Sequence, residues 1–243
     1  MEKSRAMKNV VYLLLSCVFL LAGCAKMNND VTKSVELEAF NEIELGESFE
    51  IELRESPTYH IEISGSEHFV DKVTFGIVNG SLVIDTDARA KWMHPKNNKI
   101  KIVIDCPALR KCTAYETCNI KTLNPITTPE FGLIVGGKLN TANIEVNNDI
   151  CYFWNYYPCG GKITFNGACN QFKLWGNSLI TVNARNLVTS YAYIENKANN
   201  DVSLTVTGIL QYTIGGKGNI RAYGQPTVID LISDTGEGEL ILP

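Results

Sequence analysis

The sequence predicts an all-β fold, a parallel β-helix preceded by an antiparallel β portion, and two observations lead to this prediction. Short runs of the pattern apolar–polar–apolar recur through the C-terminal half of the chain. A stretch bearing glycine or asparagine precedes each run, as the corners of stacked coils require. No amphipathic helix stands out, and only residues 67–72 suit a single helical turn.

The repeated runs are spaced at the length of one solenoid coil. They begin at Ile120, Ile144, Ile163, Ile180, Leu204, Ile220 and Leu240. The six steps between them average 20 residues. Stacking successive coils buries apolar faces that are too narrow to form a core alone, so we align these positions as equivalent. An antiparallel sandwich is the alternative, because it also contains short strands and turns.

Each coil is expected to contain a second apolar run and a tight corner. The second runs lie at 172–174, 187–188, 210–212 and 228–231. The corners lie at 136–137, 160–161, 176–177, 199–200, 215–216 and 236–238. Glycine and asparagine tolerate a positive φ, and we expect these corners to use it.

The N-terminus has the pattern of a bacterial lipoprotein leader. Basic residues fall within residues 3–8, and the apolar stretch 9–20 that follows is too short to span a membrane. The next four residues, Leu21-Ala22-Gly23-Cys24, resemble the lipobox, in which the cysteine is lipidated and becomes the first residue of the mature protein.

This leader divides the chain and predicts its location. We expect a signal peptide over 1–23, then lipidated Cys24 with a polar, flexible tether over 24–34. Acyl chains on Cys24 would make the membrane a partner of the protein. Ala25 after the cysteine resembles lipoproteins released to the outer membrane, whose periplasmic and surface faces stay open alternatives.

Residues 35–112 predict an N-terminal β-strand portion, and residues 113–243 the coils. Apolar residues alternate with glutamate or lysine at 35–38, 49–53, 60–63 and 99–104, which is typical of strands with one wet face. Asn79-Gly80 between apolar runs predicts a hairpin turn. The glutamates suit either a cation site or a solvated face that discourages edge-to-edge aggregation, and we favour the solvated face.

The balance of charge argues against a nucleic-acid partner. The formal net charge of the whole chain is −4. Without residues 1–23 the chain holds 19 Lys and Arg residues and 25 Asp and Glu residues, a net charge of −6. An acidic chain without a basic patch is a poor nucleic-acid binder.

Two stretches resemble the GIN domain, also called DUF2807, a family common among Bacteroidetes lipoproteins. The opening one contains Phe40-Asn41-Glu42-Ile43 and Ile102-Val103-Ile104-Asp105-Cys106-Pro107-Ala108-Leu109. The closing one, Ile214-Gly215-Gly216-Lys217-Gly218-Asn219-Ile220 followed by Tyr223-Gly224-Gln225-Pro226, is the most specific. The resemblance covers about Val35 to Pro243. It implies a right-handed β-helix and an adhesin-like role, and it supplies no catalytic residues.

Eight cysteines are present, of which Cys17 leaves with the signal peptide and Cys24 is lipidated. The remaining six are Cys106, Cys112, Cys118, Cys151, Cys159 and Cys169. They suit either disulfides, which the cell envelope permits, or small apolar core residues. Cys151 and Cys169 lie at nearly equivalent coil positions, which fits a stacked pair or a bridge. Their spacing matches no zinc motif.

The densest aromatic run, residues 152–157, is the candidate ligand surface. Alternation sends Tyr152, Trp154 and Tyr156 to one side and Phe153 and Tyr157 to the other. Trp175 follows at a coil-like interval, so outward rings would form an aromatic face on the rod. The alternative is that alternate rings are buried between coils.

No catalytic constellation is recognisable, since His60, His68 and His94 lie in the N-terminal half without an evident partner. We therefore predict a non-catalytic, lipid-anchored envelope protein without cofactor or metal, which displays a β-helix surface for adhesion or scaffolding. Its ligand would be a glycan or a protein. The alternative is a carbohydrate-binding module or polysaccharide-acting enzyme that uses the aromatic face near Trp154. A homo-oligomer is also expected, because open solenoid ends expose unpaired strand edges.

Overall fold

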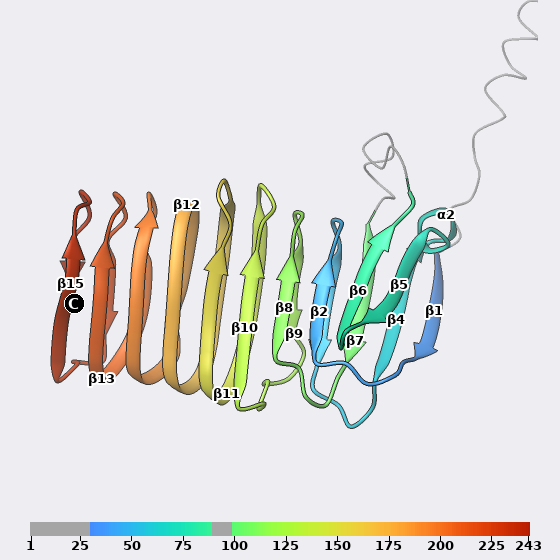
Figure 1. Cartoon of the computed structure of the whole chain (residues 1–243), viewed down its shortest axis with the longest axis horizontal. Coiled ribbons are helices and arrows are strands. Elements are labelled where there is room, and N and C mark those ends of the chain that lie inside the picture. Colours follow the sequence, from blue (N-terminus) through green and yellow to red (C-terminus); the bar gives the residue numbers. More distant parts are fainter. Residues whose placement is uncertain (1–29, 89–98) are drawn as a thin grey trace, which may run out of the picture.

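The computed structural model describes residues 30–88 and 99–243, which form a β-solenoid of about six turns (Figure 1). This arrangement confirms the fold class predicted from the repeat. The signal peptide over 1–23 and the lipidation of Cys24 lie outside the described residues and stay predictions. Within the described ranges, no helix has the length and apolar character needed to cross a membrane.

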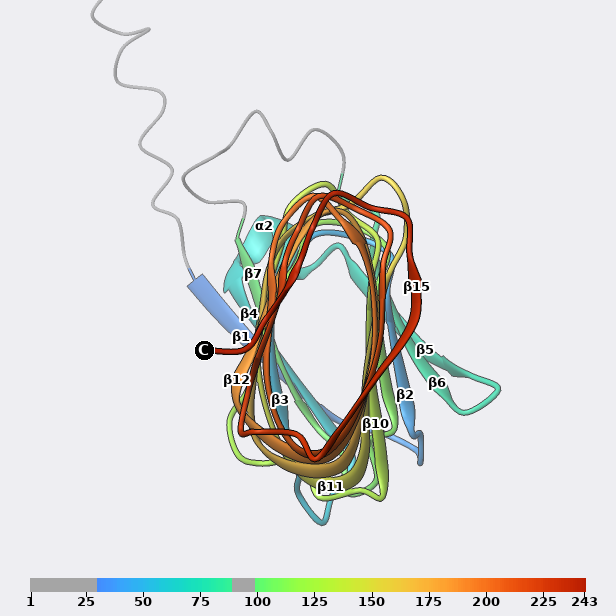
Figure 2. The same ribbon diagram turned by 90° about the vertical axis from the view of Figure 1, so that its left-hand side faces the viewer.

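The strands follow one another along the chain with a single helical turn, α2 (Glu67–Val70), after the fourth strand. The strands are β1 (Asp30–Glu36), β2 (Glu42–Leu45), β3 (Glu50–Arg54), β4 (His60–Ser66), β5 (Val73–Val78), β6 (Ser81–Thr86), β7 (Ile100–Asp105), β8 (Lys111–Ala114), β9 (Asn119–Thr122), β10 (Glu130–Val135), β11 (Asn140–Asn155), β12 (Gly160–Ala198), β13 (Val202–Ile214), β14 (Ile220–Tyr223), β15 (Val228–Asp234) and β16 (Leu240–Ile241). Along the solenoid axis the coils superimpose as a flattened tube with two long walls (Figure 2).

The coils stack through parallel strand pairing along both walls. In one wall β8 pairs with β2 and β10, and β10 pairs with the second half of β11. In the other wall β9 pairs with β3 and with the first half of β11. The long strands β12 and β13 pass through a corner and extend both walls. The apolar core fills the space between the walls, because every second side chain points inward.

The antiparallel strands expected over 35–112 are present, but they are mixed with parallel ones. β2 and β3 pair in parallel with β8 and β9, so that Ile43 lies beside Cys112 and Ile51 beside Ile120. Among the described strands, antiparallel pairing is confined to β1–β4, β4–β7 and β5–β6. The parallel partners of β2 and β3 lie far along the chain, and local alternation of side chains carries no signal for such distant pairs.

Local features of the N-terminal half follow the sequence closely. Asn79 and Gly80 have φ values of 52° and 81° and close the β5–β6 hairpin, as their turn chemistry predicts. The helical turn expected over 67–72 is α2. The tether differs from expectation, since residues 30–34 belong to β1 and pair with β4.

The predicted repeat has the correct inward residues and the wrong register. Ile120 lies beside Ala142, and Ala142 lies beside Ile163. Ile144, which the sequence aligned with Ile163, pairs with Phe165. The error is two residues, and a shift of two leaves the same side chains on the inward face. An apolar–polar–apolar pattern therefore does not distinguish the two registers.

The column continues to the C-terminal end of the rod. Val182 lies beside Val202, Val202 beside Ile220, and Ile220 beside Leu240. The alignment of Ile220 with Leu240 is thus confirmed. Leu204, which the sequence aligned with Ile180 and Ile220, lies beside Ala184 and Ala222, so these two steps are displaced by four and two residues.

The second apolar runs occupy the wall that contains β8, β10 and the second half of β11, with one exception. Leu210 lies between Ala192 and Ile229 in the stack, as the runs at 210–212 and 228–231 predict. The run at 187–188 was predicted wrongly, because Val188 pairs with Thr205 in the wall that contains β9 and the first half of β11. A register shift after residue 184 lengthens this coil before the chain crosses to the wall that contains β15.

The corner glycines are required for close packing between coils more than for a positive φ. Of the predicted corner residues, only Gly161 has a φ in the left-handed region, at 130°. A Cβ on Gly216 would come within 2.1 Å of the Ala198 carbonyl oxygen. A Cβ on Gly236 would come within 2.3 Å of the Gly216 oxygen. At Gly216 and Gly236 the corner thus lies directly on the backbone of the neighbouring coil, which leaves no room for a side chain.

Three asparagines, Asn140, Asn155 and Asn196, are fully buried at the corners. The Asn140 side-chain oxygen accepts a hydrogen bond from the Cys118 N–H at 3.0 Å, and its amide donates to the Gly137 carbonyl at 3.0 Å. Asn155 and Asn196 bond the backbone of neighbouring corners in the same way. These amides satisfy backbone groups that the turning chain removes from the strand ladder.

The two ends of the rod differ. Antiparallel strands β1 and β5 end the two walls on the N-terminal side, and β15 lies at the opposite end (Figure 1). The inward residues of the last coil are uncovered, with Ile229 41% and Leu231 49% exposed. Leu210, the neighbour of Ile229 in the preceding coil, is fully buried. The C-terminal end is therefore an open coil.

Candidate ligand-binding surface

Aromatic side chains line the outer surface of the wall that contains β8, β10 and the second half of β11. We call Tyr115, Trp154, Tyr156, Trp175 and Tyr193 the aromatic strip. Within β11 the alternating side chains are buried, so the intervening rings must face outward. Tyr115, Trp154 and Tyr156 are 46%, 38% and 36% exposed, and the other two are half-buried.

The rings of the strip form two groups in contact, one of Tyr115, Tyr156 and Trp154 and one of Trp175 and Tyr193. The ring centroids are 6.2 Å apart for Tyr115 and Tyr156, 4.6 Å for Tyr156 and Trp154, and 5.7 Å for Trp175 and Tyr193. Trp154 and Trp175 are direct neighbours in the parallel pairing of β11 with β12. The strip therefore runs across the strands, along the solenoid axis.

Glycines in the intervening coil make room for the rings. The N–H groups of Tyr115, Gly136 and Tyr156 donate to equivalent carbonyls of successive coils, so Gly136 lies between the two tyrosines. Having no side chain, Gly136 lets the two rings approach across it. In the same coil, Gly132 lies beneath the ring of Tyr152, which is half-buried on the same face.

The structure therefore brings together most of the predicted aromatic residues. Trp154, Tyr156 and Trp175 belong to the strip, and Tyr152 borders it. Tyr157 was expected on the inward side, but it is 80% exposed because it follows β11 in a turn and no longer obeys strand alternation. Sequence reasoning missed Tyr115. The sequence feature that could have indicated it is its position directly after the apolar run 112–114.

Charged groups border the strip in balanced pairs. The Tyr115 hydroxyl donates to Glu44 at 3.3 Å, and the Tyr193 hydroxyl donates to Glu195 at 3.4 Å. Lys111 forms an ion pair with Glu42, and Lys197 forms one with Glu195. Burial raises the pKa of the Tyr115 and Tyr193 hydroxyls, and the adjacent carboxylates raise it further. Both hydroxyls are thus protonated donors at neutral pH.

The early glutamates are paired with lysines across the other wall. Glu52 is nearly buried and contacts Lys101 at 3.0 Å and Lys121 at 2.8 Å. Burial alone would raise the pKa of Glu52, but the hydrogen bonds and charges of the two lysines outweigh it, and the net pKa is lowered. Within the described ranges, no three acidic, histidine or cysteine side chains converge as metal ligands would. This face fits the interpretation of a paired, solvated surface better than a cation site.

A serine, a histidine and an aspartate lie in a row on β1, β4 and β7. The Ser34 hydroxyl oxygen is 2.7 Å from His60 Nε2, and His60 Nδ1 is 3.7 Å from Asp105 Oδ2. Asp105 also accepts a 2.7 Å hydrogen bond from Arg54. The histidine–aspartate distance exceeds hydrogen-bond reach, and the arginine takes the carboxylate that would orient the imidazole. We interpret the row as part of the strand-to-strand pairing; His94 lies outside the described residues.

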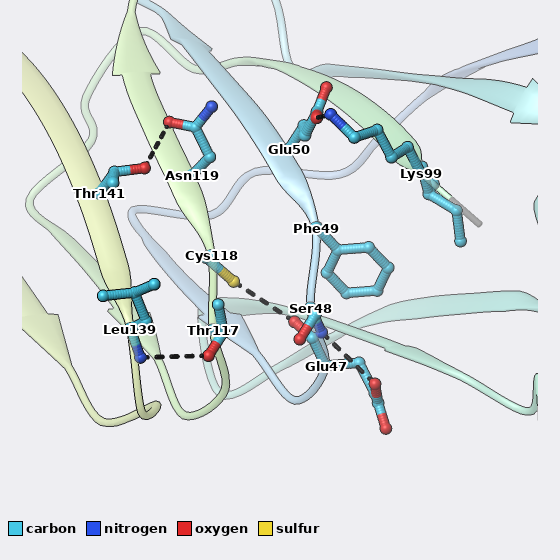
Figure 3. Close-up of a pocket in the computed structure, with 11 residues that line it drawn as sticks. Glu47, Ser48, Phe49, Glu50, Lys99, Thr117, Cys118, Asn119, Leu139 and Thr141 are labelled. Atoms are coloured by element: carbon cyan, nitrogen blue, oxygen red, sulfur yellow. Dashed lines mark hydrogen bonds and ion pairs between the residues drawn. The ribbon is translucent and has the colours of Figure 1, made fainter. Parts of the chain in front are cut away.

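A hollow with a volume of about 510 Å³ lies beside the N-terminal ends of β3 and β9 (Figure 3). Its rim carries the Glu50–Lys99 ion pair at 2.8 Å and a 2.9 Å hydrogen bond from Thr141 to Asn119. It adjoins Lys99, directly after the undescribed range 89–98, so we assign no ligand to it. No residue of the strip lines this hollow.

The six cysteines Cys106, Cys112, Cys118, Cys151, Cys159 and Cys169 are all buried, and none of them forms a disulfide. This supports the interpretation as small core residues over the one as disulfides. Burial raises the pKa of the Cys106 and Cys169 thiols to about 11 and that of Cys112 further still. Cys151 lies beside Phe172 in the stack.

Solved structures of low sequence identity share this fold. A "putative adhesin" from Bacteroides fragilis is 18% identical with a TM-score of 0.77, and the match covers 87% of this chain and 96% of that one. A "putative adhesin" from Parabacteroides distasonis is 16% identical with a TM-score of 0.65, covering 88% and 98%. A "putative lipid binding protein" from the same species is 15% identical with a TM-score of 0.62, covering 89% and 98%.

The sequence itself carries the family assignment. No curated protein matches it. The family model described as "Putative auto-transporter adhesin, head GIN domain" (DUF2807) matches residues 39–226. This range includes the opening and closing motifs and all the residues of the aromatic strip. The chain therefore belongs to the DUF2807 family of adhesin-like head GIN domains.

Proposed function

We propose that this protein is a non-catalytic, lipid-anchored component of the outer membrane that adheres to a partner through the aromatic strip. The observation that carries the proposal is the strip itself, two groups of touching rings whose members Trp154 and Trp175 are direct neighbours on paired strands. Isolated exposed aromatics are ordinary on protein surfaces, whereas a contiguous group of them is typical of an interaction site. The adhesin-like family supports the same role.

The shape of the strip favours binding over catalysis. The carboxylates that accept hydrogen bonds from its phenol hydroxyls, Glu44 and Glu195, lie on strands that are five interstrand steps apart, or roughly 24 Å at the usual spacing. Glycoside hydrolysis needs two carboxyl groups on either side of one bond, within about 5–9.5 Å of each other. The polysaccharide-acting enzyme considered as an alternative therefore has less support than a binding surface.

The anchor rests on Leu21-Ala22-Gly23-Cys24. Cells grown with a clickable fatty acid should label the wild-type protein, and Cys24→Ala should abolish the label and release the protein from the membrane fraction. Labelling that survives Cys24→Ala would contradict the anchor without touching the adhesive role.

The adhesive role is tested on intact cells. Antibody and protease should reach the protein on whole cells as well as in lysates, and cells that express it should bind a host-cell or mucin-coated surface. Trp154→Ala with Trp175→Ala should reduce binding strongly. Tyr223→Ala is the matched control, because Tyr223 is an aromatic residue on β14, in the opposite wall. Protection in whole cells would refute surface adhesion and leave a periplasmic scaffold.

A further inference from the structure

We infer that the ligand of the aromatic strip is a neutral glycan chain that lies along the solenoid axis, an inference that rests on the proposed function and specifies its partner. Three properties of the strip lead to it: its length and width, the chemistry of its rings, and the balance of charge around it.

The strip is long and narrow, and it is widest at the end of β11, where Trp154 and Tyr156 lie side by side. It begins at Tyr115 beside β8, crosses β10 and β11, and ends at Tyr193 in the second passage of β12. The strip thus spans five stacked strand passages, and the four intervals between them make it roughly 19 Å long at the usual spacing. None of the described pockets is lined by these rings. A narrow, open line of this length suits an extended chain of several units, and it offers no closed site for a single sugar or a chain end.

The rings supply the contact that a sugar needs. One face of a pyranose carries C–H groups of slight positive charge, and the face of an aromatic ring is the negative part of its quadrupole. Trp154 and Trp175 are direct neighbours on adjacent coils, so successive sugar units could each cover an indole. Phenol hydroxyls at both ends, on Tyr115 and Tyr193, donate to Glu44 and Glu195, and their oxygens can accept hydrogen bonds from sugar hydroxyls.

The border of the strip favours a ligand without charge. Lys111 and Lys197 are each engaged in an ion pair with a glutamate, so their charge is already neutralised. Glu44 and Glu195 add carboxylates close to the outermost rings. A sulfated, phosphorylated or uronic-acid chain would meet these carboxylates without an unpaired cationic cluster to offset them. Neutral hydroxyls can instead bond either member of each pair.

A protein partner is the other occupant, and the strip fits it less well. Stable protein interfaces bury roughly 800 Å² on each side around a broad apolar centre. Here charged side chains interrupt the aromatic surface: Lys173 is the neighbour of Tyr152 on the adjacent strand, and Glu195 follows Tyr193 along β12. This pattern gives a line of rings and no broad patch.

The test is affinity electrophoresis of the full chain in detergent through gels that contain one polysaccharide each. The neutral probes are a β-glucan, an α-glucan, a mannan and a galactan, and the acidic probes are pectate and heparin. We expect retardation by at least one neutral probe, and weaker retardation by both acidic ones. Trp154→Ala and Trp175→Ala should each weaken binding about tenfold, the upper range of one ring contact. Tyr223→Ala should bind as wild type, and Trp154→Phe should retain most of the affinity.

Oligosaccharides of increasing length from the retained polysaccharide then test the extended mode. Affinity should rise up to about the length of the strip and then level off. Retardation by none of the neutral probes, or unchanged binding by Trp154→Ala, would overturn the inference. If Trp154→Ala abolishes cell adhesion while no glycan binds, the adhesive role stands and the glycan is wrong. If a variant with an unchanged melting temperature loses both cell adhesion and glycan binding, the adhesive role and the glycan ligand are supported together.

Discussion

The ring of Tyr152 covers the backbone of Gly132 on the neighbouring strand. A Cβ at Gly132 would come within 1.9 Å of Cζ of that ring. Gly132 and Tyr152 are direct neighbours in the parallel pairing of β10 with β11, so the ring has folded into the space that a side chain would normally fill. This pair keeps Tyr152 flat beside the aromatic strip.

Gly132→Ala should therefore displace the Tyr152 ring and destabilise the protein by about 1–2 kcal/mol, the usual cost of overpacking. In a Tyr152→Ala background the same change should be neutral or stabilising, because the clash is gone and alanine is better suited than glycine to a strand interior. Urea unfolding of the four proteins in this double-mutant cycle measures the coupling. Additive effects would show that the ring does not depend on the glycine.

The corner glycines predict a contrast between two alanine substitutions. Gly216→Ala should cost at least about 2 kcal/mol, because its Cβ would lie 2.1 Å from the Ala198 oxygen and backbone cannot yield as a side chain does. Gly76→Ala is the matched control in β5, where a Cβ meets nothing within 4 Å. It should change stability by less than about 0.5 kcal/mol. Equal losses in thermal unfolding would refute the stacked-corner explanation.

The lowered pKa of Glu52 predicts a dependence of stability on pH. Because the pKa of the folded state lies below the usual 4.5, ionised Glu52 stabilises the fold at pH values above about 4.5. This contribution is lost as the pH falls through the lowered pKa, where the carboxylate is protonated and its pairs with Lys101 and Lys121 are broken. Urea midpoints from pH 7 to 3 should fall less steeply for Glu52→Gln than for wild type. Parallel curves would contradict the assignment.

The open end of the rod predicts that two leucines in the last two passages of this wall, Leu210 and Leu231, differ in their tolerance of substitution. Leu210→Lys places a charge in a fully buried site and should unfold the protein or cost more than about 3 kcal/mol. Leu231→Lys lies in the last coil, where the side chain is 49% exposed, and should cost less than about 1 kcal/mol. Circular dichroism and thermal melting compare the two. A large loss with Leu231→Lys would mean that the last coil is covered.

The homo-oligomer expected from the sequence stays a prediction, and the same variant tests it. If two copies meet through their open ends, sedimentation should show a dimer that Leu231→Lys dissociates. The dimer should strengthen with salt, since Asp230, Asp234, Glu237 and Glu239 lie near this end beside a single lysine, Lys217. A monomer at all concentrations would refute it.

The absence of disulfides among the six buried cysteines can be tested by thiol labelling. The folded protein should react slowly with a maleimide at pH 7.5, because burial raises the pKa values of these thiols. After denaturation without reductant, mass spectrometry should find six alkylated thiols in the coils. Missing pairs of labels would reveal disulfides, which the alternative interpretation of the sequence required.

Much of the fold was predictable because side-chain alternation survives a register error of two residues. The inward set, such as Ile120, Ile163 and Leu204, followed from period-2 patterning alone. The register did not, because a shift of two residues preserves that pattern. The buried amides of Asn140 and Asn155 were not predictable either: a corner asparagine looks the same in sequence whether it turns the chain or bonds the next corner from inside.

The candidate surface was predicted in part for the same reason. Alternation placed Trp154 and Tyr156 on one side, and the structure has both facing outward. The contact of Tyr156 with Tyr115 depends on Gly136 in the coil between them, a relationship that appears only once the coils are in register. Tyr157 was misplaced because strand alternation ends where β11 ends.

β1 has a mechanical consequence. A mechanical force applied to the chain before Asp30 is transmitted to the solenoid through β1. This strand pairs with β4 alone and has mostly exposed side chains. Its seven residue pairs with β4 share a load applied along the strand, but they separate one after another when the load is applied across it. Under tension β1 would peel away before the buried coils yield. Detachment of β1 would thus relieve the tension before it unfolds the wall that carries the aromatic rings.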